Sequence, residues 1–154
     1  MSFTVDIGID DPHWRKVRGL PAYLRRAVEL ALKRAKAGKS SALTILLASD
    51  ARLKELNRDF RGKNKPTNVL SFPTDTEGDA YPGDIALGYG VTAGEARSKT
   101  VRIADHAAHL AVHGTLHLLG FDHETGRDAK VMESLETKIL AELGIADPYA
   151  QGVA

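Results

Sequence analysis

Three histidines stand at a spacing that suits a single metal ion. They are His113, His117 and His123, in the string His-Gly-x-x-His-x-x-Gly-x-x-His. Two histidines four residues apart lie on one face of a helix, about one turn apart, so both imidazoles can reach the same ion. Gly120 can adopt a positive φ and turn the chain back, which lets the third histidine approach. Three neutral imidazoles with a fourth position left to water describe a catalytic Zn²⁺ site, so we expect one zinc per chain.

The whole spacing is that of the metzincin metalloproteases, with one departure. Position 114, where such a protease carries its general-base glutamate, is Gly114. A glycine cannot take a proton from a metal-bound water. The sequence therefore predicts a metal-binding site that lacks the glutamate needed for peptide hydrolysis. It does not identify another general base.

Three further side chains lie near the histidine string. His106 and His109 share its helical face and could be further ligands or partners of the ligands, but we expect them to be core or helix-surface histidines. Asp122 could orient a metal-bound imidazole through its second nitrogen. It could equally cap a helix that starts near Thr125, and the sequence favours neither role.

Length and composition indicate one globular domain over residues 1–154. The chain has no cysteine, which excludes a disulfide framework, a thiolate nucleophile and Cys-type zinc ligands. No signal peptide is visible at Met1–Asp11, and no apolar run approaches the roughly 18 residues that a membrane span needs. We therefore expect a cytoplasmic protein with no membrane partner.

The near-neutral net charge of +1 conceals a basic half. Between Arg15 and Lys39 there are nine basic residues and one acidic residue, and between Arg52 and Lys65 six basic and two acidic residues. Acidic residues gather elsewhere, at 75–84 and after Asp122. Such asymmetry favours a polyanionic partner such as nucleic acid, although a solvated helix face would also explain a single run of charge.

Hydrophobic periodicity predicts an α+β fold, in which a small mixed β-sheet is packed with helices as an α-β-α sandwich without a strict βαβ repeat. Strands are expected at 3–9, 41–48, 68–72 and 84–87, and helices at 21–37, 51–61, 91–99, 101–119 and about 125–143. Helix 101–119 would be a metzincin-like zinc helix carrying His113 and His117. In helix 51–61 we expect Leu53, Leu56 and Phe60 to face inward.

Four stretches closely resemble the YbeY family of bacterial ribosomal-RNA maturation factors. They are Leu-Asn-Arg-Asp-Phe-Arg at 56–61, Lys-Pro-Thr-Asn-Val-Leu-Ser-Phe-Pro at 65–73, Gly-Asp-Ile at 83–85, and the histidine string. The resemblance covers most of the chain in the same order, with Asn68 where many members are expected to have aspartate. It implies a zinc-dependent, single-strand-specific endoribonuclease that acts on small-subunit (16S) rRNA at its 3′ end and in ribosome quality control. The implied partners are single-stranded rRNA and the small ribosomal subunit.

The resemblance also implies a catalytic role for Arg61. A planar guanidinium can clamp two oxygens of a phosphate whose charge grows during cleavage. Two other functions stay open: a metal-dependent peptidase or amidohydrolase, which Gly114 disfavours, and a non-catalytic ribosome-assembly factor that binds RNA. An open three-histidine site favours catalysis, because structural zinc is usually closed by four protein ligands. The oligomeric state, the native metal and the product ends stay open.

Overall fold

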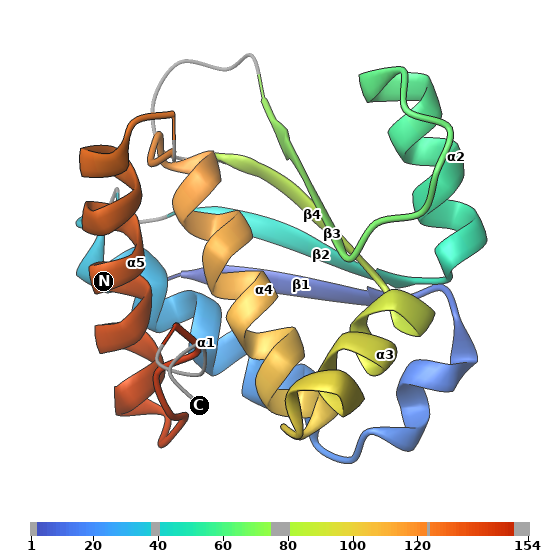
Figure 1. The fold of residues 1–154 in the computed structure, drawn as a ribbon, viewed down its shortest axis with the longest axis horizontal. Coiled ribbons are helices and arrows are strands. Elements are labelled where there is room, and N and C mark those ends of the chain that lie inside the picture. Colours follow the sequence, from blue (N-terminus) through green and yellow to red (C-terminus); the bar gives the residue numbers. More distant parts are fainter. Residues whose placement is uncertain (1–2, 38–40, 75–80, 123, 150–154) are drawn as a thin grey trace.

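A central sheet is covered by helices on both faces in the computed structural model, which describes residues 3–37, 41–74, 81–122 and 124–149 (Figure 1). The strands are β1 (Thr4–Ile9), β2 (Ala42–Ala48), β3 (Val69–Pro73) and β4 (Gly83–Gly88). The helices are α1 (Leu20–Arg34), α2 (Asp50–Arg61), α3 (Tyr89–Lys99), α4 (Ile103–Leu118) and α5 (Gly126–Glu142), with a short 3₁₀ helix at Pro12–Lys16. The predicted α+β class is confirmed.

Within the described residues, four strands form one mixed sheet in the order β1-β2-β4-β3. The strands β1, β2 and β4 run parallel, and β3 pairs antiparallel with β4 at the end of this order. Because side chains alternate between faces, Ser71 of β3 and its partner Ile85 of β4 point to the same side as α4. The edge strand β3 thus lies directly beside the helix that carries the histidine string.

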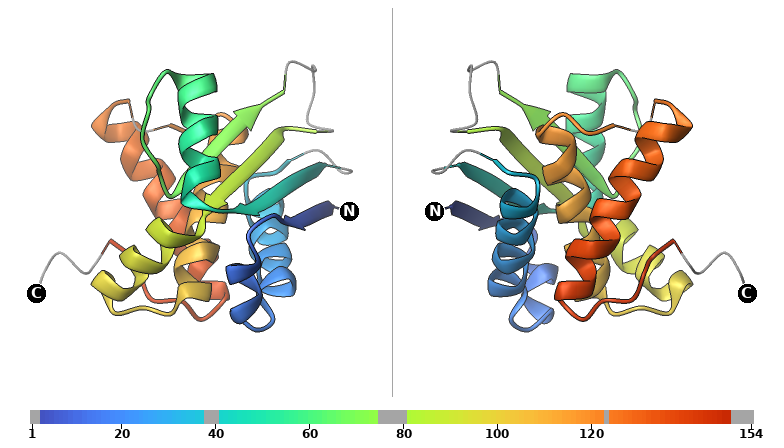
Figure 2. Two further views of the ribbon diagram at one scale, coloured as in Figure 1. Left: turned by 90° about the vertical axis from the view of Figure 1, so that its right-hand side faces the viewer. Right: turned by 90° about the vertical axis from the view of Figure 1, so that its left-hand side faces the viewer.

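The main core lies between the sheet and the layer of α1, α4 and α5 (Figures 1 and 2). The apolar stripe of α1 is completely buried there, at Leu20, Leu24, Val28 and Leu32. The helix α4 is buried over most of its length, which suits its predominantly apolar sequence. The helix α4 packs against α1, α3, α5 and the strands β3 and β4. Close packing on several sides fixes the positions of its side chains, including those outside the core.

The opposite face of the sheet is covered mainly by α2, over a small second core of Ala48, Leu53, Leu70 and Ala86. The prediction that Phe60 faces inward is wrong: Leu53 is buried and Leu56 half-buried, but the Phe60 side chain is 69% exposed. A single helix covers only part of a sheet face, so the last turn of α2 leaves Phe60 outside the small core. Part of this sheet face therefore stays open.

Most predicted boundaries agree with the structure to within two residues, but the end of α1 differs. The helix stops at Arg34, three residues before the predicted end, because Lys36 adopts a left-handed conformation with φ of 58°. The amide of Ala37 then donates to the carbonyl of Leu32 and closes the helix end. The expected stop signal, Gly38, and most of the acidic loop expected at 74–82 lie outside the described residues.

No helix in the part of the chain that the structure describes has both the length and the apolar character required to span a bilayer.

Candidate active site

His113 and His117 lie one turn apart near the end of α4. Their ring centroids are 5.1 Å apart and the ring planes meet at 80°. Both side chains line a pocket of about 250 Å³ between α4 and the edge strand β3, together with Arg61 from α2. The structure therefore brings together three of the four site residues that the sequence nominates.

The chain turns sharply after His117. Gly120 has a φ of 100°, as its place in the motif predicts. Its amide donates to the carbonyl of His117, and the amide of Phe121 donates to the carbonyl of Leu116, which is the Schellman arrangement that ends a helix. The path toward residue 123 is thus set by a left-handed glycine.

The third predicted ligand, His123, lies outside the described residues. Among the described residues, no group of three or more His, Asp or Glu side chains could hold a metal ion. The three-histidine ligand set therefore stays a prediction.

The environment of His113 fits a metal ligand, because a buried carboxylate holds the opposite side of its ring. Nδ1 of His113 lies 2.7 Å from Oε1 of Glu136 on α5, and Nε2 of His109 lies 3.1 Å from Oε2. The hydroxyl of Tyr149 donates to the same carboxylate. Glu136 itself has no exposed surface.

These contacts determine which nitrogen of His113 carries the proton. Burial raises the pKa of Glu136, but the hydrogen bonds from His109, His113 and Tyr149 outweigh it and bring the pKa to about 2. The carboxylate is therefore ionised and can only accept, so the Nδ1 of His113 is the donor. In the neutral imidazole this places the lone pair on Nε2, and an imidazole nitrogen with a lone pair is the form that binds a metal.

Glu136 is a site residue that the motifs do not predict, although its position on α5 carries a signal. Met132, Ile139 and Leu140 are all buried, and Glu136 stands among them at helical spacing of four, three and four residues. A carboxylate on the apolar face of a helix needs a hydrogen-bonding partner. The helical histidines are such partners, but which ones α5 faces is decided by tertiary packing.

The two preceding histidines of α4 are buried, as expected, and neither lines the pocket. Nε2 of His106 lies 2.8 Å from Oε1 of Glu95 on α3, which also accepts from Nδ2 of Asn68 at 2.9 Å. Burial lowers the pKa of His106, and the hydrogen bond to Glu95 opposes this shift. Asn68 is therefore hydrogen-bonded to α3, and it is not among the residues that line the pocket of His113 and His117.

Asp122 does not cap the last helix. The side chain of Thr125 does so by accepting from the amide of Asp128 at 3.0 Å. Oδ1 of Asp122 accepts from the amide of Glu124 at 3.2 Å, which forms a turn ahead of α5. The capping alternative is wrong, and the orienting role stays a prediction.

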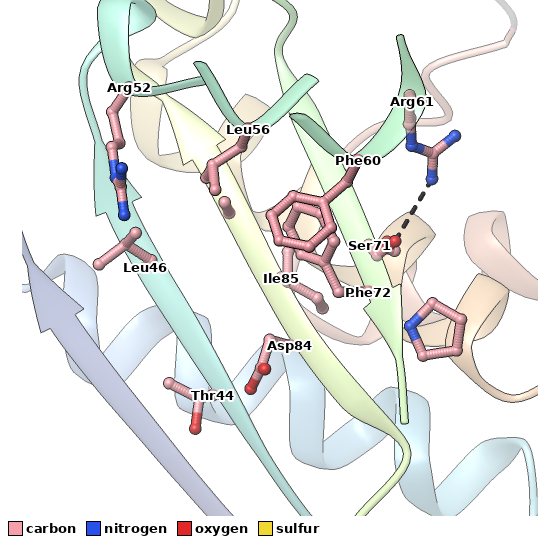
Figure 3. Close-up of a pocket in the computed structure, with 12 residues that line it drawn as sticks. Thr44, Leu46, Arg52, Leu56, Phe60, Arg61, Ser71, Phe72, Asp84 and Ile85 are labelled. Atoms are coloured by element: carbon pink, nitrogen blue, oxygen red, sulfur yellow. Dashed lines mark hydrogen bonds between the residues drawn. The ribbon is translucent and has the colours of Figure 1, made fainter. Parts of the chain in front are cut away.

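Arg61 ends α2 and reaches across the edge of the sheet. Gly62 follows with a φ of 68° and terminates the helix. Nη2 of Arg61 donates to the carbonyl of Ser71 at 3.3 Å, and Figure 3 shows the guanidinium extended along β3, away from the pair of phenylalanines. A guanidinium carries five N–H donors, and this bond uses one of them.

Gly114 lies where α4 packs closely against the sheet. A Cβ at this position would lie 3.0 Å from Oγ of Ser71 and 3.2 Å from Cδ1 of Ile85, so it would be directed at the sheet. The close approach lets the carbonyl of Gly114 accept from the Ser71 hydroxyl at 3.4 Å. A glutamate at position 114 would meet β3 and β4 in this structure.

Comparisons with known proteins agree on one family. The model of the family described as "Endoribonuclease YbeY" matches residues 10–144. A protein named Endoribonuclease YbeY from Maricaulis maris is 42% identical over 145 residues, covering 94% of this chain and 91% of its own. One from Jannaschia sp. is 44% identical over 162 residues, covering 94% and 99%.

A solved structure shares the fold. The solution structure of TM1509 from Thermotoga maritima has a TM-score of 0.63 at 26% identity and covers 90% of this chain and 88% of its own. Together with the family match, these similarities show that this chain belongs to the YbeY family.

Proposed function

We propose that this chain is a zinc-dependent, single-strand-specific endoribonuclease that matures the 3′ end of 16S rRNA. It would act in the cytoplasm on the small ribosomal subunit and take part in ribosome quality control. The observation that carries the proposal is that Arg61, His113 and His117 line one pocket, although they come from two helices on opposite faces of the sheet. The family name, Endoribonuclease YbeY, supports an RNA phosphodiester as the substrate.

His113, His117 and His123 would hold the metal. Zinc held there would supply Lewis-acid chemistry, by polarising a phosphoryl oxygen and by lowering the pKa of a water toward about 7. The buried carboxylate of Glu136 supports this assignment, because it leaves Nε2 of His113 as the unprotonated nitrogen. Glu136 acts through His113 and does not touch the substrate.

Arg61 binds the phosphate undergoing cleavage. Charge builds on the phosphoryl oxygens in the transition state, and a guanidinium offers two parallel N–H donors to them. The contact with the Ser71 carbonyl orients the guanidinium along the pocket wall. The basic side chains of α2 and of the loop that follows it would hold the RNA backbone, because phosphate contacts dominate the affinity of such proteins.

Gly114 argues against the peptidase alternative, since the structure has no room for a glutamate at that position without displacing Ser71 or Ile85. The assembly-factor alternative differs from the proposal in one respect: the protein would bind rRNA but would not cleave it. Purified, metal-quantified protein should be offered structured rRNA and casein, with and without chelator. We expect cleavage of single-stranded rRNA segments that the chelator abolishes, and no cleavage of casein.

The ends of the products identify the nucleophile. A 2′,3′-cyclic phosphate means that the ribose 2′-hydroxyl attacks, and a 5′-phosphate means that water attacks. Binding of rRNA without cleavage by the metal-loaded protein would favour the assembly-factor alternative. Hydrolysis of casein would favour the peptidase.

A further inference from the structure

A groove of about 770 Å³ lies on the open part of the sheet, next to the active-site pocket. It is formed by β2, β3, β4 and the inner side of α2 (Figure 3). Arg61, Ser71 and Pro73 line both the groove and the pocket that contains His113 and His117. The two spaces are therefore neighbours across the strand β3, and one RNA strand can occupy both.

Two phenylalanines stand over the middle of the groove. Phe60 of α2 and Phe72 of β3 have ring centroids 5.3 Å apart at 66°, an edge-to-face contact. The side chain of Phe60 is 69% exposed, so a large aromatic surface stays in contact with solvent. Below the rings, Leu46, Leu56 and Ala86 give the groove an apolar floor.

Charge is distributed unevenly around this aromatic pair. Figure 3 shows Arg52 and Arg61 on opposite sides of the phenylalanines, one toward β2 and one at β3. The exposed carboxylate of Asp84 lies near Thr44, and it accepts from the hydroxyl of Tyr81. A phosphate is attracted to the two arginines and repelled by Asp84, whereas a neutral base is compatible with the floor.

We propose that the groove binds one unpaired nucleobase of the RNA, adjacent to the phosphate that is cleaved. The proposal rests on the proposed endoribonuclease function and identifies where that enzyme reads its substrate. The base stacks on the Phe60 ring, and the flanking phosphates lie against Arg52 and Arg61. Asp84 accepts from N–H groups on the edge of the base, because an ionised carboxylate has only acceptors.

This arrangement gives a physical reason for selecting single strands. A base can enter the groove and stack on Phe60 only when it is neither paired nor stacked on its neighbours. An aromatic ring can stack on any base, because every base has a π-face. The subsite would therefore select unpaired over paired RNA more strongly than it would select one base over another. Asp84 would add a modest preference for bases that present donors.

The test pairs a change in the protein with a change in the RNA. A single-stranded oligoribonucleotide is prepared intact and with an abasic ribose at one position at a time. Its affinity for the chelated protein is measured for the parent and for Phe60→Ala. For the parent, we expect one abasic position next to the cleavage site to weaken binding roughly 5- to 150-fold, the range for loss of one base–aromatic stack.

Phe60→Ala should weaken binding of the intact strand by the same factor. The affinity of this variant should be the same for the intact strand and for the strand that is abasic at that position. Val131→Ala serves as the control, since Val131 is also an exposed apolar side chain but lies on α5, away from the groove. Phe60→Trp should retain affinity, and its indole fluorescence should be quenched by the intact strand. The native Trp14 is only 1% exposed and gives a constant background.

Two results would overturn the subsite. Equal weakening of every strand by Phe60→Ala would mean a general effect on RNA binding. The second is that the parent protein binds every abasic strand as tightly as the intact one while it cleaves RNA normally. That result would mean that the groove binds another ligand, such as a protein, and it would leave the enzymatic function intact. Absence of cleavage by metal-loaded parent, with coupling between Phe60 and one base intact, would overturn the enzymatic function and leave the subsite.

Discussion

The carboxylate of Glu136 fixes the imidazole of His113: Oε1 of Glu136 lies 2.7 Å from Nδ1 of His113. The same carboxylate also accepts from His109 and Tyr149, so the last helix and the segment that follows it are joined to α4 at the active site. Because Glu136 is ionised and buried, the hydrogen bond sets both the tautomer and the direction of the His113 ring.

Glu136→Gln should weaken zinc binding by about 10- to 100-fold, the usual effect of losing the partner of a metal-binding histidine. Affinity is measured by competition with a chromophoric chelator. Glu142→Gln is the matched control. It removes a carboxylate from the same helix, but this carboxylate pairs with Arg34 at the surface and not with a histidine. Equal zinc affinity in the parent and in Glu136→Gln would show that His113 does not need this partner.

Alanine at His113, His117 or His123 should reduce bound zinc well below one per chain. The fold should survive, because the core between the sheet and α1, α4 and α5 consists of apolar side chains and contains none of the proposed zinc ligands. Zinc content by elemental analysis and thermal unfolding of the same preparations check both points. If all three variants keep stoichiometric zinc, the ligand set is wrong; if they unfold, the site is structural.

Arg61→Ala should slow RNA cleavage by roughly 10²- to 10³-fold, or about 2.7–4 kcal/mol, by analogy with removal of one donor from an oxyanion hole. Zinc content should stay at the parent level, because Arg61 is not a proposed ligand. Arg61→Lys should recover little, since an ammonium keeps the charge but loses the two-pronged geometry. Single-turnover cleavage measures the effect. An unchanged rate in the alanine variant would make Arg61 a surface residue without a catalytic role.

Gly114→Ala should leave the protein about 1–3 kcal/mol less stable than Gly94→Ala does, because the new methyl group would approach Ser71 and Ile85 to 3.0–3.3 Å. Gly94→Ala in α3 is the control: a Cβ there meets nothing within 4 Å, so alanine should stabilise the helix by up to about 1 kcal/mol. Denaturant unfolding compares the two. Gly114→Glu should be still less stable and should hydrolyse no peptide; peptidase activity in that variant would contradict the nuclease assignment.

The pH dependence of stability should contain a contribution from His106. Burial lowers its pKa below 6.5 in the folded protein, so below that pH the unfolded chain binds the additional proton first. The free energy of unfolding should therefore fall as the pH drops from 6.5 through the lowered pKa. His106→Asn can still hydrogen-bond but does not titrate, so its stability should change less over this range. Denaturant titrations of both proteins at several pH values make the comparison, and parallel profiles would contradict it.

Much of the site could be predicted from local sequence, because its signals are local. The spacing of His113 and His117 requires only a helix, and the left-handed φ of Gly120 follows from a glycine that must end it. The alternating and helical patterns also placed the four strands and five main helices, since burial of one face dictates those periods.

Other features depended on which elements pack together. Glu136 is 23 residues from His113, and no local pattern states that α5 faces α4 at that point. Phe60 looked like a core residue, but the limited cover that α2 provides leaves it exposed beside Phe72. The motif shows only that Gly114 replaces a catalytic glutamate, whereas the close approach of α4 to Ser71 depends on how the helix packs on the sheet.

The sequence by itself determined the family motifs, the helical pair of histidines and the basic character of residues 52–65, because each depends on residue type and near spacing. Only the tertiary structure decided that Arg61 shares a pocket with His113 and His117, that Glu136 sets the tautomer of His113, and that an aromatic groove adjoins the site. The physical reason is that these contacts join elements distant in sequence. Their positions follow from how the sheet and helices bury their apolar faces together.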